Sequence, residues 1–441
     1  MSRAGMRKSD ILGMGLMVFA FFLGAGNLIF PPWAGQQAGE NLWLALIGFL
    51  ATDVGLSLLA IIAIAMVGSP ESLTRDIPGV LAPLFWIAVY IIIGPAFAVP
   101  RTSIVAYEVG VLPWISQSSS LYLALYSLLF FSVALCLCIN PGKLVNIVGK
   151  VLAPVLAAVL AALYMAMLLQ APAEFGEGVG QWKEHAMLEG AVQGYLTMDT
   201  LGALAFGIVI VAAVRRYGVS DHRLVVRHAI QAALIAGAGL SLVYLGLFYL
   251  GGMSQGLVTD ATHGGQILAY MVTHLLGPMG KVALSLVITL ACLTTAVGVT
   301  TSCGDYFHHR WPRISYRFWV SILCLASMVV ANIGLETLLK LSIPVVITLY
   351  PVAIMVVVAG ILRNWITLSR GSMQAALLVI ILFSSIDGLN AVGFLKGIEM
   401  TDHIPLFDNG LGWLLPGLSV LVFGWLIRSV AELKKRGNVE S

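Results

Sequence analysis

The sequence predicts an all-α integral membrane protein with twelve transmembrane helices, on three observations. Of the 441 residues, 59% are hydrophobic and only 10% are charged, with a mean hydropathy of +0.95, whereas soluble domains are typically about one-quarter charged. Apolar runs of about 20 residues recur along the whole chain. The polar stretches are only loop-sized, so we expect a single membrane domain over residues 1–441. The net charge of +3 is small and requires no nucleic-acid partner.

The apolar runs and the breaks between them place the twelve spans to within about four residues. The spans cover 10–37, 40–67, 80–112, 120–139, 144–170, 190–214, 224–251, 279–307, 314–333, 335–362, 372–396 and 410–432. Five of the 24 Lys and Arg residues are external or lie within spans, and the other 19 fall in segments that are cytoplasmic if the amino terminus is inside. This bias predicts that both termini are cytoplasmic and that the number of spans is even.

The first span contains a stretch that an ordinary lipid-facing helix would not use. Residues 20–32 read AFFLGAGNLIFPP. The two glycines weaken a helix, and the two prolines remove hydrogen-bond donors. Freed backbone groups at membrane depth are tolerated only where protein, water or a solute satisfies them. A helix broken around Asn27 is therefore a candidate solute and ion site, and the alternative is a kinked helix with a glycine packing face.

The sixth span repeats this anomaly over residues 190–207, which read GAVQGYLTMDTLGALAFG. Spans one and six are five apart, as expected for two inverted repeats of five spans, over 10–170 and 190–362, followed by two additional helices over 372–432. Interruptions at corresponding positions of two halves point to a transporter binding site, here formed by broken helices 1 and 6.

The chemistry of such breaks suits a zwitterion. Backbone N–H groups exposed near 24–27 would bind a carboxylate, and unwound carbonyls would bind an ammonium group or a hard cation. The eighth span adds adjacent hydroxyls at Thr294 and Thr295. Such hydroxyls usually bond back to the backbone of their own helix, which is the alternative to a ligand role.

At these residues the chain resembles the bacterial branched-chain amino acid:cation symporters, which have the leucine-transporter-like fold. The motifs are FLGAGNLIFPP at 22–32, GPAFAVPRT at 94–102, NPGK at 140–143 and GYLTMDTLGA at 194–203, and the resemblance covers nearly the whole length. It implies sodium-coupled import of leucine, isoleucine and valine by alternating access across the bacterial cytoplasmic (inner) membrane, by a protein that works as a monomer. A proton or lithium as the coupling ion, or a non-transporting sensor of the same fold, are the alternatives.

The resemblance also implies a set of site residues. The substrate would contact Gly24, Ala25, Gly26, Asn27, Phe97, Arg101, Tyr195, Leu196, Thr197 and Asp199. One sodium ion would be held by carbonyls of Ala20, Leu23 and Ala291 and by the hydroxyls of Thr294 and Thr295. A second sodium ion, found in only some members of the superfamily, would use Phe22, Asn27 and Thr197, although its ligand from the seventh helix has no match here.

Ionisable residues inside spans are functional candidates because burying charge in lipid is costly. Arg101 either steers the carboxylate and closes an external gate, or forms a structural ion pair with Glu108. Asp199 either pairs with the ammonium or cation, or caps a helix. Asp53 and Asp387 also lie in apolar surroundings and receive no role.

Nothing in the sequence indicates an enzyme. It contains no Ser-His-Asp, His-Glu-x-x-His or phosphate-loop signature and no nucleotide-binding domain. The eight histidines fall mostly in cytoplasmic loops and are expected to be solvated. An ion gradient is then the energy source that remains.

Overall fold

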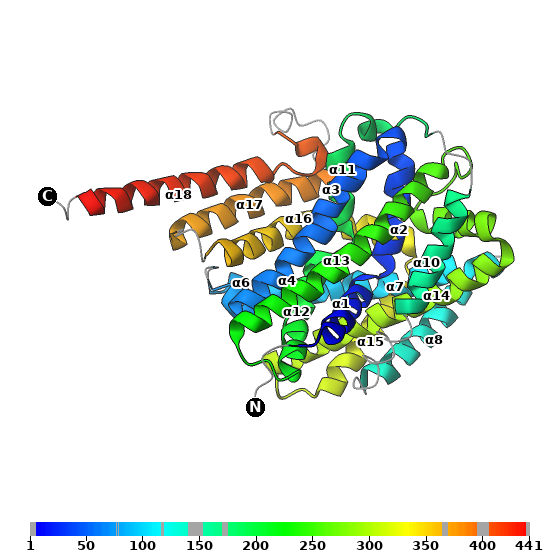
Figure 1. The fold of residues 1–441 in the computed structure, drawn as a ribbon, viewed down its shortest axis with the longest axis horizontal. Helices are drawn as coiled ribbons and strands as arrows, with labels where there is room; N and C mark the ends of the chain where they lie inside the picture. Colours follow the sequence, from blue (N-terminus) through cyan, green and yellow to red (C-terminus); the bar gives the residue numbers. More distant parts are fainter. Residues whose placement is uncertain are drawn as a thin grey trace.

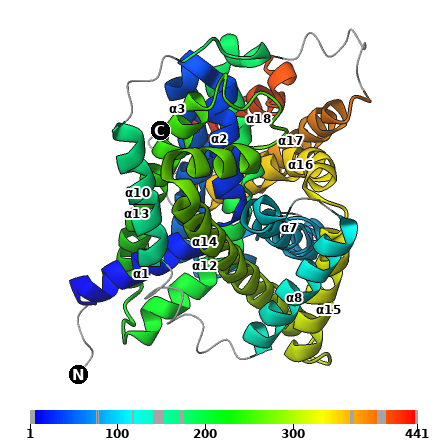
Figure 2. The ribbon, with the colours of Figure 1, turned by 90° about the vertical axis from the view of Figure 1, so that its right-hand side faces the viewer.

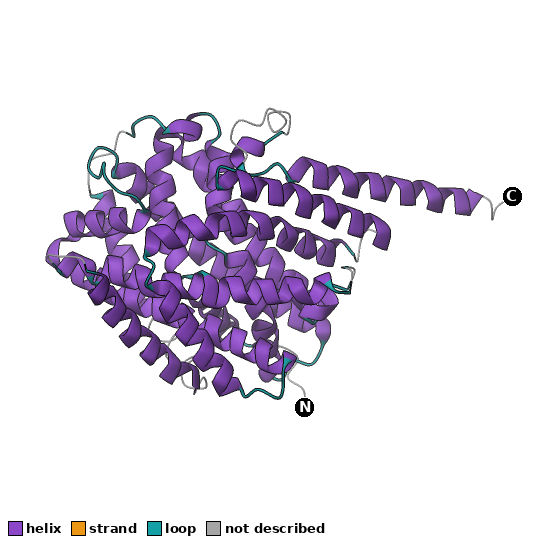
Figure 3. Ribbon diagram, turned by 180° about the vertical axis from the view of Figure 1, so that it is seen from behind, coloured by secondary structure: helices purple, strands orange, loops and turns teal. Residues whose placement is uncertain are grey.

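The computed structural model describes residues 6–75, 77, 79–115, 119–139, 153–169, 175–363, 369–394 and 405–437. All regular structure within these ranges is helical (Figure 3). The α-helices are α1 (Lys8–Phe22), α2 (Ala25–Ala38), α3 (Leu42–Leu50), α4 (Leu56–Val67), α5 (Pro70–Leu73), α6 (Leu81–Ile91), α7 (Ala98–Gly110), α8 (Ser120–Ile139), α10 (Ala153–Leu168), α11 (Ala186–Leu196), α12 (Asp199–Arg216), α13 (His222–Met253), α14 (Gly264–Arg310), α15 (Tyr316–Ala331), α16 (Leu335–Leu362), α17 (Arg370–Ala391) and α18 (Leu414–Gly437). The expected all-α class is confirmed.

Helices occupy the expected spans, with the first part of 144–170 and the NPGK motif at 140–143 outside the described residues. Within the described part of the chain, seven helices are long and apolar enough to cross a membrane, or eight if the bent pair α11–α12 is one span. Long exposed apolar faces support a membrane setting, and α18 carries Val422, Phe423 and Ile427 on such a face. It packs on α17 and extends away from the other helices (Figure 1).

Two of the expected spans are interrupted near their middle. α1 ends at Phe22 and α2 begins at Ala25, because Leu23 (ψ 78°) and Gly24 (ψ −169°) leave the helical region. α11 and α12 meet at a bend of 45°. At that bend Met198 adopts a left-handed conformation with φ 70°, which costs a non-glycine residue about 1–2 kcal/mol.

Glycines let helices that are distant in the chain approach backbone to backbone. A Cβ atom on Gly35 of α2 would collide with the Phe248 carbonyl of α13, and one on Gly251 of α13 would collide with the Pro32 carbonyl of α2. In the same way Gly190 of α11 faces the Ala45 carbonyl of α3. These contacts hold α2 and α11 in the middle of the bundle, where Figures 1 and 2 show α2 surrounded by later helices.

The long helix α14 changes direction at Gly277 (φ 62°), which is followed by Pro278. Its first part packs on α2, since a Cβ atom on Gly264 would collide with the Ile29 carbonyl. Its second part packs along α7. The two parts of α14 therefore pack against the region around the α1–α2 break from different directions.

Candidate functional site

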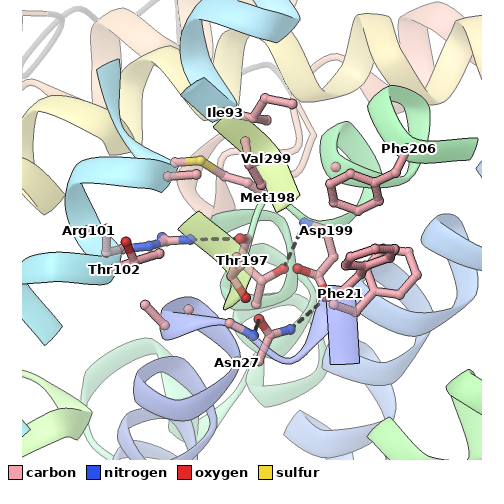
Figure 4. Close-up of a pocket in the computed structure, with 17 residues that line it drawn as sticks. Phe21, Asn27, Ile93, Arg101, Thr102, Thr197, Met198, Asp199, Phe206 and Val299 are labelled. Carbon is pink, nitrogen blue, oxygen red and sulfur yellow. Dashed lines mark hydrogen bonds between the residues drawn. The ribbon is translucent and has the colours of Figure 1, made fainter. Parts of the chain in front are cut away.

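A cavity lies between the two interruptions (Figure 4). Its walls come from α1, α2, α7, α12 and α14 and from the turn between Ile92 and Ala96. They contain Phe21, Phe22, Gly24, Ala25, Gly26, Asn27, Ile93, Ala98, Arg101, Thr102, Thr197, Met198, Asp199, Gly202, Phe206, Thr295 and Val299. We call this space the central cavity. The volume of the central cavity is about 40 Å³.

Asn27 joins the two broken helices. Its Nδ2 donates to Asp199 Oδ2 at 2.6 Å and also to the Tyr244 hydroxyl, while its Oδ1 accepts from the Gly24 amide at 3.1 Å. The Asn27 side chain therefore fixes the first turn of α2 and ties it to the first residue of α12. Asn27 and Asp199 are almost fully buried, so these hydrogen bonds replace the water that a buried amide and carboxyl would otherwise need.

Arg101 reaches from α7 toward the end of α11 (Figure 4). Its Nη1 and Nη2 donate to the carbonyl oxygens of Leu196 and Thr197, both at 2.7 Å. Its guanidinium carbon lies 5.3 Å from the centroid of the Phe30 ring, within the range of a cation–π interaction. Because the C-terminal end of a helix carries partial negative charge, α11 is a favourable place for this cation.

The proposed ion pair of Arg101 with Glu108 is wrong. Glu108 Oε2 lies 2.9 Å from His263 Nε2, in the segment that leads into α14. Arg101 and Glu108 are seven residues apart on α7, about 10 Å along the axis. Most of the described histidines are exposed, as expected, but His263 and His228 are buried.

Asp53 joins the same polar cluster from a π-helical turn between α3 and α4 (Ala51–Gly55). It is fully buried, and its Oδ1 accepts from the Thr197 hydroxyl. That hydroxyl also lies 2.7 Å from the Gly194 carbonyl. Nothing in the sequence marks Asp53 or Tyr244 beyond the rarity of polar groups in apolar spans.

The residues expected to bind the first sodium ion lie at the end of α1 (Ala20 and Leu23) and on α14 (Ala291, Thr294 and Thr295). The Gly24 amide, which would bond the Ala20 carbonyl in a continuous helix, instead bonds the Phe22 carbonyl at 2.6 Å. Thr294 donates to the Ala291 carbonyl at 2.8 Å. Thr295 lines the central cavity, and among the described residues its buried hydroxyl has no hydrogen-bond partner.

Not every expected substrate contact reaches the cavity. Gly24 to Asn27, Arg101, Thr197 and Asp199 line it, whereas Phe97, Tyr195 and Leu196 do not. Tyr195 stacks on Tyr350 with a centroid distance of 4.6 Å, and Leu196 contributes its carbonyl to Arg101. Phe21, Ile93, Met198, Phe206 and Val299 supply an apolar wall that the sequence analysis did not assign.

The lining of the central cavity offers polar groups of both signs, as a small zwitterion would require. Among the described residues, no three His, Cys, Asp or Glu side chains are grouped as ligands for a metal ion. The cavity instead combines helix ends, hydroxyls, one carboxyl group, one guanidinium and apolar side chains.

Comparison with known proteins decides the family. The model of the family described as "Branched-chain amino acid transport protein" matches residues 7–431. The chain belongs to this family. It is a multi-pass membrane transport protein and not an enzyme, as the resemblance in its motifs predicted.

Members of the branched-chain amino acid transport family from several bacteria are similar over nearly the whole chain. The "Branched-chain amino acid transport system 2 carrier protein" of Pseudomonas aeruginosa is 47% identical, and the comparison covers 95% of each chain. The "Branched-chain amino acid permease BrnQ" of Escherichia coli is 41% identical, again over 95% of each. The "Branched-chain amino acid permease BraB" of Bacillus subtilis is 37% identical over the same shares.

Solved structures outside this family share the fold. Mhp1, a nucleobase-cation-symport-1 family transporter in a closed conformation with bromovinylhydantoin bound, has a TM-score of 0.62 at 13% identity and covers 96% of this chain and 95% of its own. MhsT in complex with L-phenylalanine has a TM-score of 0.55 at 16% identity, covering 93% and 97%. The overall fold of this chain is therefore shared with these two proteins.

Proposed function

We propose that the protein imports leucine, isoleucine and valine across the bacterial inner membrane, driven by a sodium gradient and working by alternating access. The proposal combines the family with the geometry of the central cavity. The amino acid would bind between the two broken helices, and closure of these helices would occlude it before release on the cytoplasmic side.

One observation carries the proposal: two helix ends of opposite polarity meet at the central cavity. The N-terminal end of α2 begins at Ala25, and the C-terminal end of α11 stops at Leu196. Free N–H groups and the positive end of the helix dipole favour a carboxylate at α2. The negative end of α11 and the Asp199 carboxyl favour an ammonium group. An α-amino acid has both groups, and Phe21, Phe206 and Val299 would enclose a branched side chain.

The Arg101 side chain would fill part of this site and close it on its outer side. A Cβ atom on Gly26 would lie 2.7 Å from Arg101 Nη2, so the guanidinium fills the space beside the start of α2. Its positive charge at the α11 carbonyls stands where a substrate ammonium would be favoured. Substrate binding would therefore require Arg101 to withdraw, which opens the small cavity to an amino acid.

The coupling ion would bind between the end of α1 and α14, on the side of the α1–α2 break away from the substrate. Sodium prefers oxygen ligands, and the carbonyls of Ala20, Leu23 and Ala291 with the hydroxyls of Thr294 and Thr295 would supply them. The unpartnered Thr295 hydroxyl supports this assignment. A second sodium ion at Phe22, Asn27 and Thr197 has less support, because Asn27 Oδ1 and the Phe22 carbonyl already accept from Gly24.

The topology that goes with this function has twelve spans and cytoplasmic termini. Residues 10–170 and 190–362 would form two inverted repeats of five spans, with two further helices over 372–432, in a protein that functions as a monomer. The interruptions at Leu23–Gly24 and at Met198 would then occupy corresponding positions of the two repeats.

Leucine uptake into proteoliposomes tests the proposal. We expect accumulation with an inward sodium gradient, none with equal sodium on both sides, and competition by isoleucine and valine. Uptake that depends on a pH gradient and not on sodium would show that the coupling ion is the proton. Saturable leucine binding without accumulation under either gradient would identify a sensor instead of a carrier.

A further inference from the structure

Tyr164 on α10 is hydrogen-bonded to the backbone of α13. Its hydroxyl donates to the carbonyl oxygens of Leu242 and Val243, with a distance of 2.6 Å to Val243, and accepts from the Gly246 amide at 3.0 Å. In an uninterrupted α-helix the Gly246 amide would bond the Leu242 carbonyl. The Tyr164 hydroxyl therefore bonds both the donor and the acceptor of one turn of α13, the turn 242–246.

Gly246 makes room for this contact. A Cβ atom on Gly246 would overlap the Tyr164 ring, so a larger residue at this position would displace Tyr164. Both residues line a cavity of about 670 Å³ between α1, α10 and α13, whose walls are mostly apolar. Of the α10 residues in these walls, Ala161, Tyr164 and Met167, Tyr164 alone has a polar side chain. It is therefore the polar connection from α10 to α13 at this cavity, in surroundings where a hydrogen bond is stronger than in water.

The turn 242–246 carries Tyr244, which contacts the broken helices. The Tyr244 side chain is fully buried, and its hydroxyl accepts from Asn27 Nδ2. Asn27 in turn donates to Asp199 and accepts from the Gly24 amide. A series of hydrogen bonds therefore leads from α10 through one turn of α13 to both helix breaks.

We propose that Tyr164 is a positioning residue for the central cavity. Its hydroxyl fixes the turn 242–246, and this turn holds the Tyr244 hydroxyl at Asn27. Tyr164 does not line the central cavity, so it acts through Tyr244 and not by contact with a bound amino acid. The inference rests on the proposed function, because leucine is the ligand whose binding Tyr164 supports.

A purely structural role for Tyr164 predicts a different result. If its hydroxyl only stabilised the contact between α10 and α13, its removal would lower the amount of folded protein, while the folded molecules would bind leucine as wild type does. If it positions Tyr244, its removal leaves Tyr244 and Asn27 less well fixed, and leucine binds more weakly to molecules that are correctly folded. The leucine affinity of the folded molecules therefore separates the two roles.

Leucine binding and uptake by the full-length protein test the proposal. Tyr164→Phe keeps the ring and removes the hydroxyl. We expect both the Kd in nanodiscs and the KM in proteoliposomes to rise about three- to tenfold, as for the loss of one hydrogen bond, with an unchanged maximal rate per folded molecule. Tyr249→Phe is the matched control, because Tyr249 also lies on α13 and lines the same cavity but packs against Phe175 through its ring. It should leave Kd and KM unchanged.

A double variant shows whether Tyr164 acts through Tyr244. Tyr244→Phe removes the hydroxyl that accepts from Asn27. Residues that act through one another have effects that do not add, so Tyr164→Phe should weaken leucine binding little or not at all when Tyr244→Phe is already present. If the two changes multiply in Kd, Tyr164 does not act through Tyr244 and the proposal is wrong.

Gly246→Ala is a test that leaves both hydroxyls in the protein. Its methyl group displaces the Tyr164 ring, and alanine favours a helix more than glycine does, so α13 itself is not weakened. We expect the same rise in Kd as for Tyr164→Phe, and no further rise when the two changes are combined. A wild-type Kd in Gly246→Ala would overturn the proposal.

The possible outcomes separate this inference from the proposed function. If wild-type protein neither binds nor takes up leucine, the proposed function itself fails. If wild-type protein takes up leucine and Tyr164→Phe has the same Kd and KM, the proposed function stands and Tyr164 has no positioning role. A lower yield of folded Tyr164→Phe with the wild-type Kd would leave Tyr164 a structural role alone.

Discussion

Gly26 is the position in the central cavity where an added side chain meets the most obstacles. A Cβ atom there would lie 2.7 Å from Arg101 Nη2 and 3.1 Å from the Thr197 Cα atom. Gly26→Leu should therefore abolish leucine uptake, because the side chain fills the gap in which α2 would meet the substrate carboxylate. Uptake in proteoliposomes measures this.

Gly13→Leu provides the control for that substitution. Gly13 lies on α1, and a Cβ atom there meets nothing within 4 Å, so the same change should leave uptake within about twofold of wild type, in line with the small effect of most surface substitutions. If Gly26→Leu leaves uptake unaltered, the substrate carboxylate does not bind beside Gly26.

The neighbouring hydroxyls of α14 differ in what they already bind. Thr294 donates to the Ala291 carbonyl, whereas the buried hydroxyl of Thr295, beside Gly24, has no partner among the described residues. Thr295→Ala should raise the sodium concentration for half-maximal uptake about tenfold, since one interaction with a charged group contributes about 1.5–3 kcal/mol. Thr294→Ala should act in the same direction.

Thr295→Ser is the informative companion variant, because it keeps the hydroxyl and removes only a methyl group. It should retain most of the sodium affinity. If both Thr295→Ala and Thr294→Ala show the sodium dependence of wild type, the ion does not bind at α14.

At the scale of helices, the contact between α2 and α13 depends on missing side chains. Gly35 and Gly251 each face a backbone carbonyl of the other helix at a distance that leaves no room for a Cβ atom. Gly251→Val should separate the helices and lower the thermal midpoint of the purified protein, since overpacking typically costs about 1–3 kcal/mol. Gly13→Val, whose added side chain meets open space, should leave the thermal midpoint unchanged. If Gly251→Val and Gly13→Val have the same midpoint, the two helices can move apart freely.

The breaks in the helices could be predicted from the sequence, whereas the long-range hydrogen-bond partners of residues near these breaks could not. Glycine, proline and asparagine at 24–32 weaken a helix by local chemistry, so the end of α1 at Phe22 follows from neighbouring residues. The acceptors of Arg101 are carbonyls 95 and 96 residues away. Sequence reasoning gave an ion pair with the nearby Glu108 as one of two roles for Arg101, although helical geometry keeps those two apart.

The same limit applies to Asp53 and His263. Asp53 lies in an apolar stretch and His263 in a polar loop, and each finds a partner that is distant in the chain. The motifs at 22–32 and 194–203 could identify the family and most of the cavity residues. Phe97 and Tyr195 belong to equally apolar stretches, yet their side chains turn elsewhere, because the orientation of a side chain is decided by packing.

At the scale of the whole molecule, the distribution of positive charge predicts the orientation of the protein in the membrane. The bias of Lys and Arg predicts cytoplasmic termini, which places the segment 175–185 outside the cell and the α12–α13 turn inside. Gln181 and Ser220 are exposed on these two segments. In a variant with Cys136→Ser, which removes the exposed native thiol, we expect a membrane-impermeant maleimide to label Gln181→Cys in intact cells and Ser220→Cys only after permeabilisation. The reverse pattern would show that the predicted orientation is inverted.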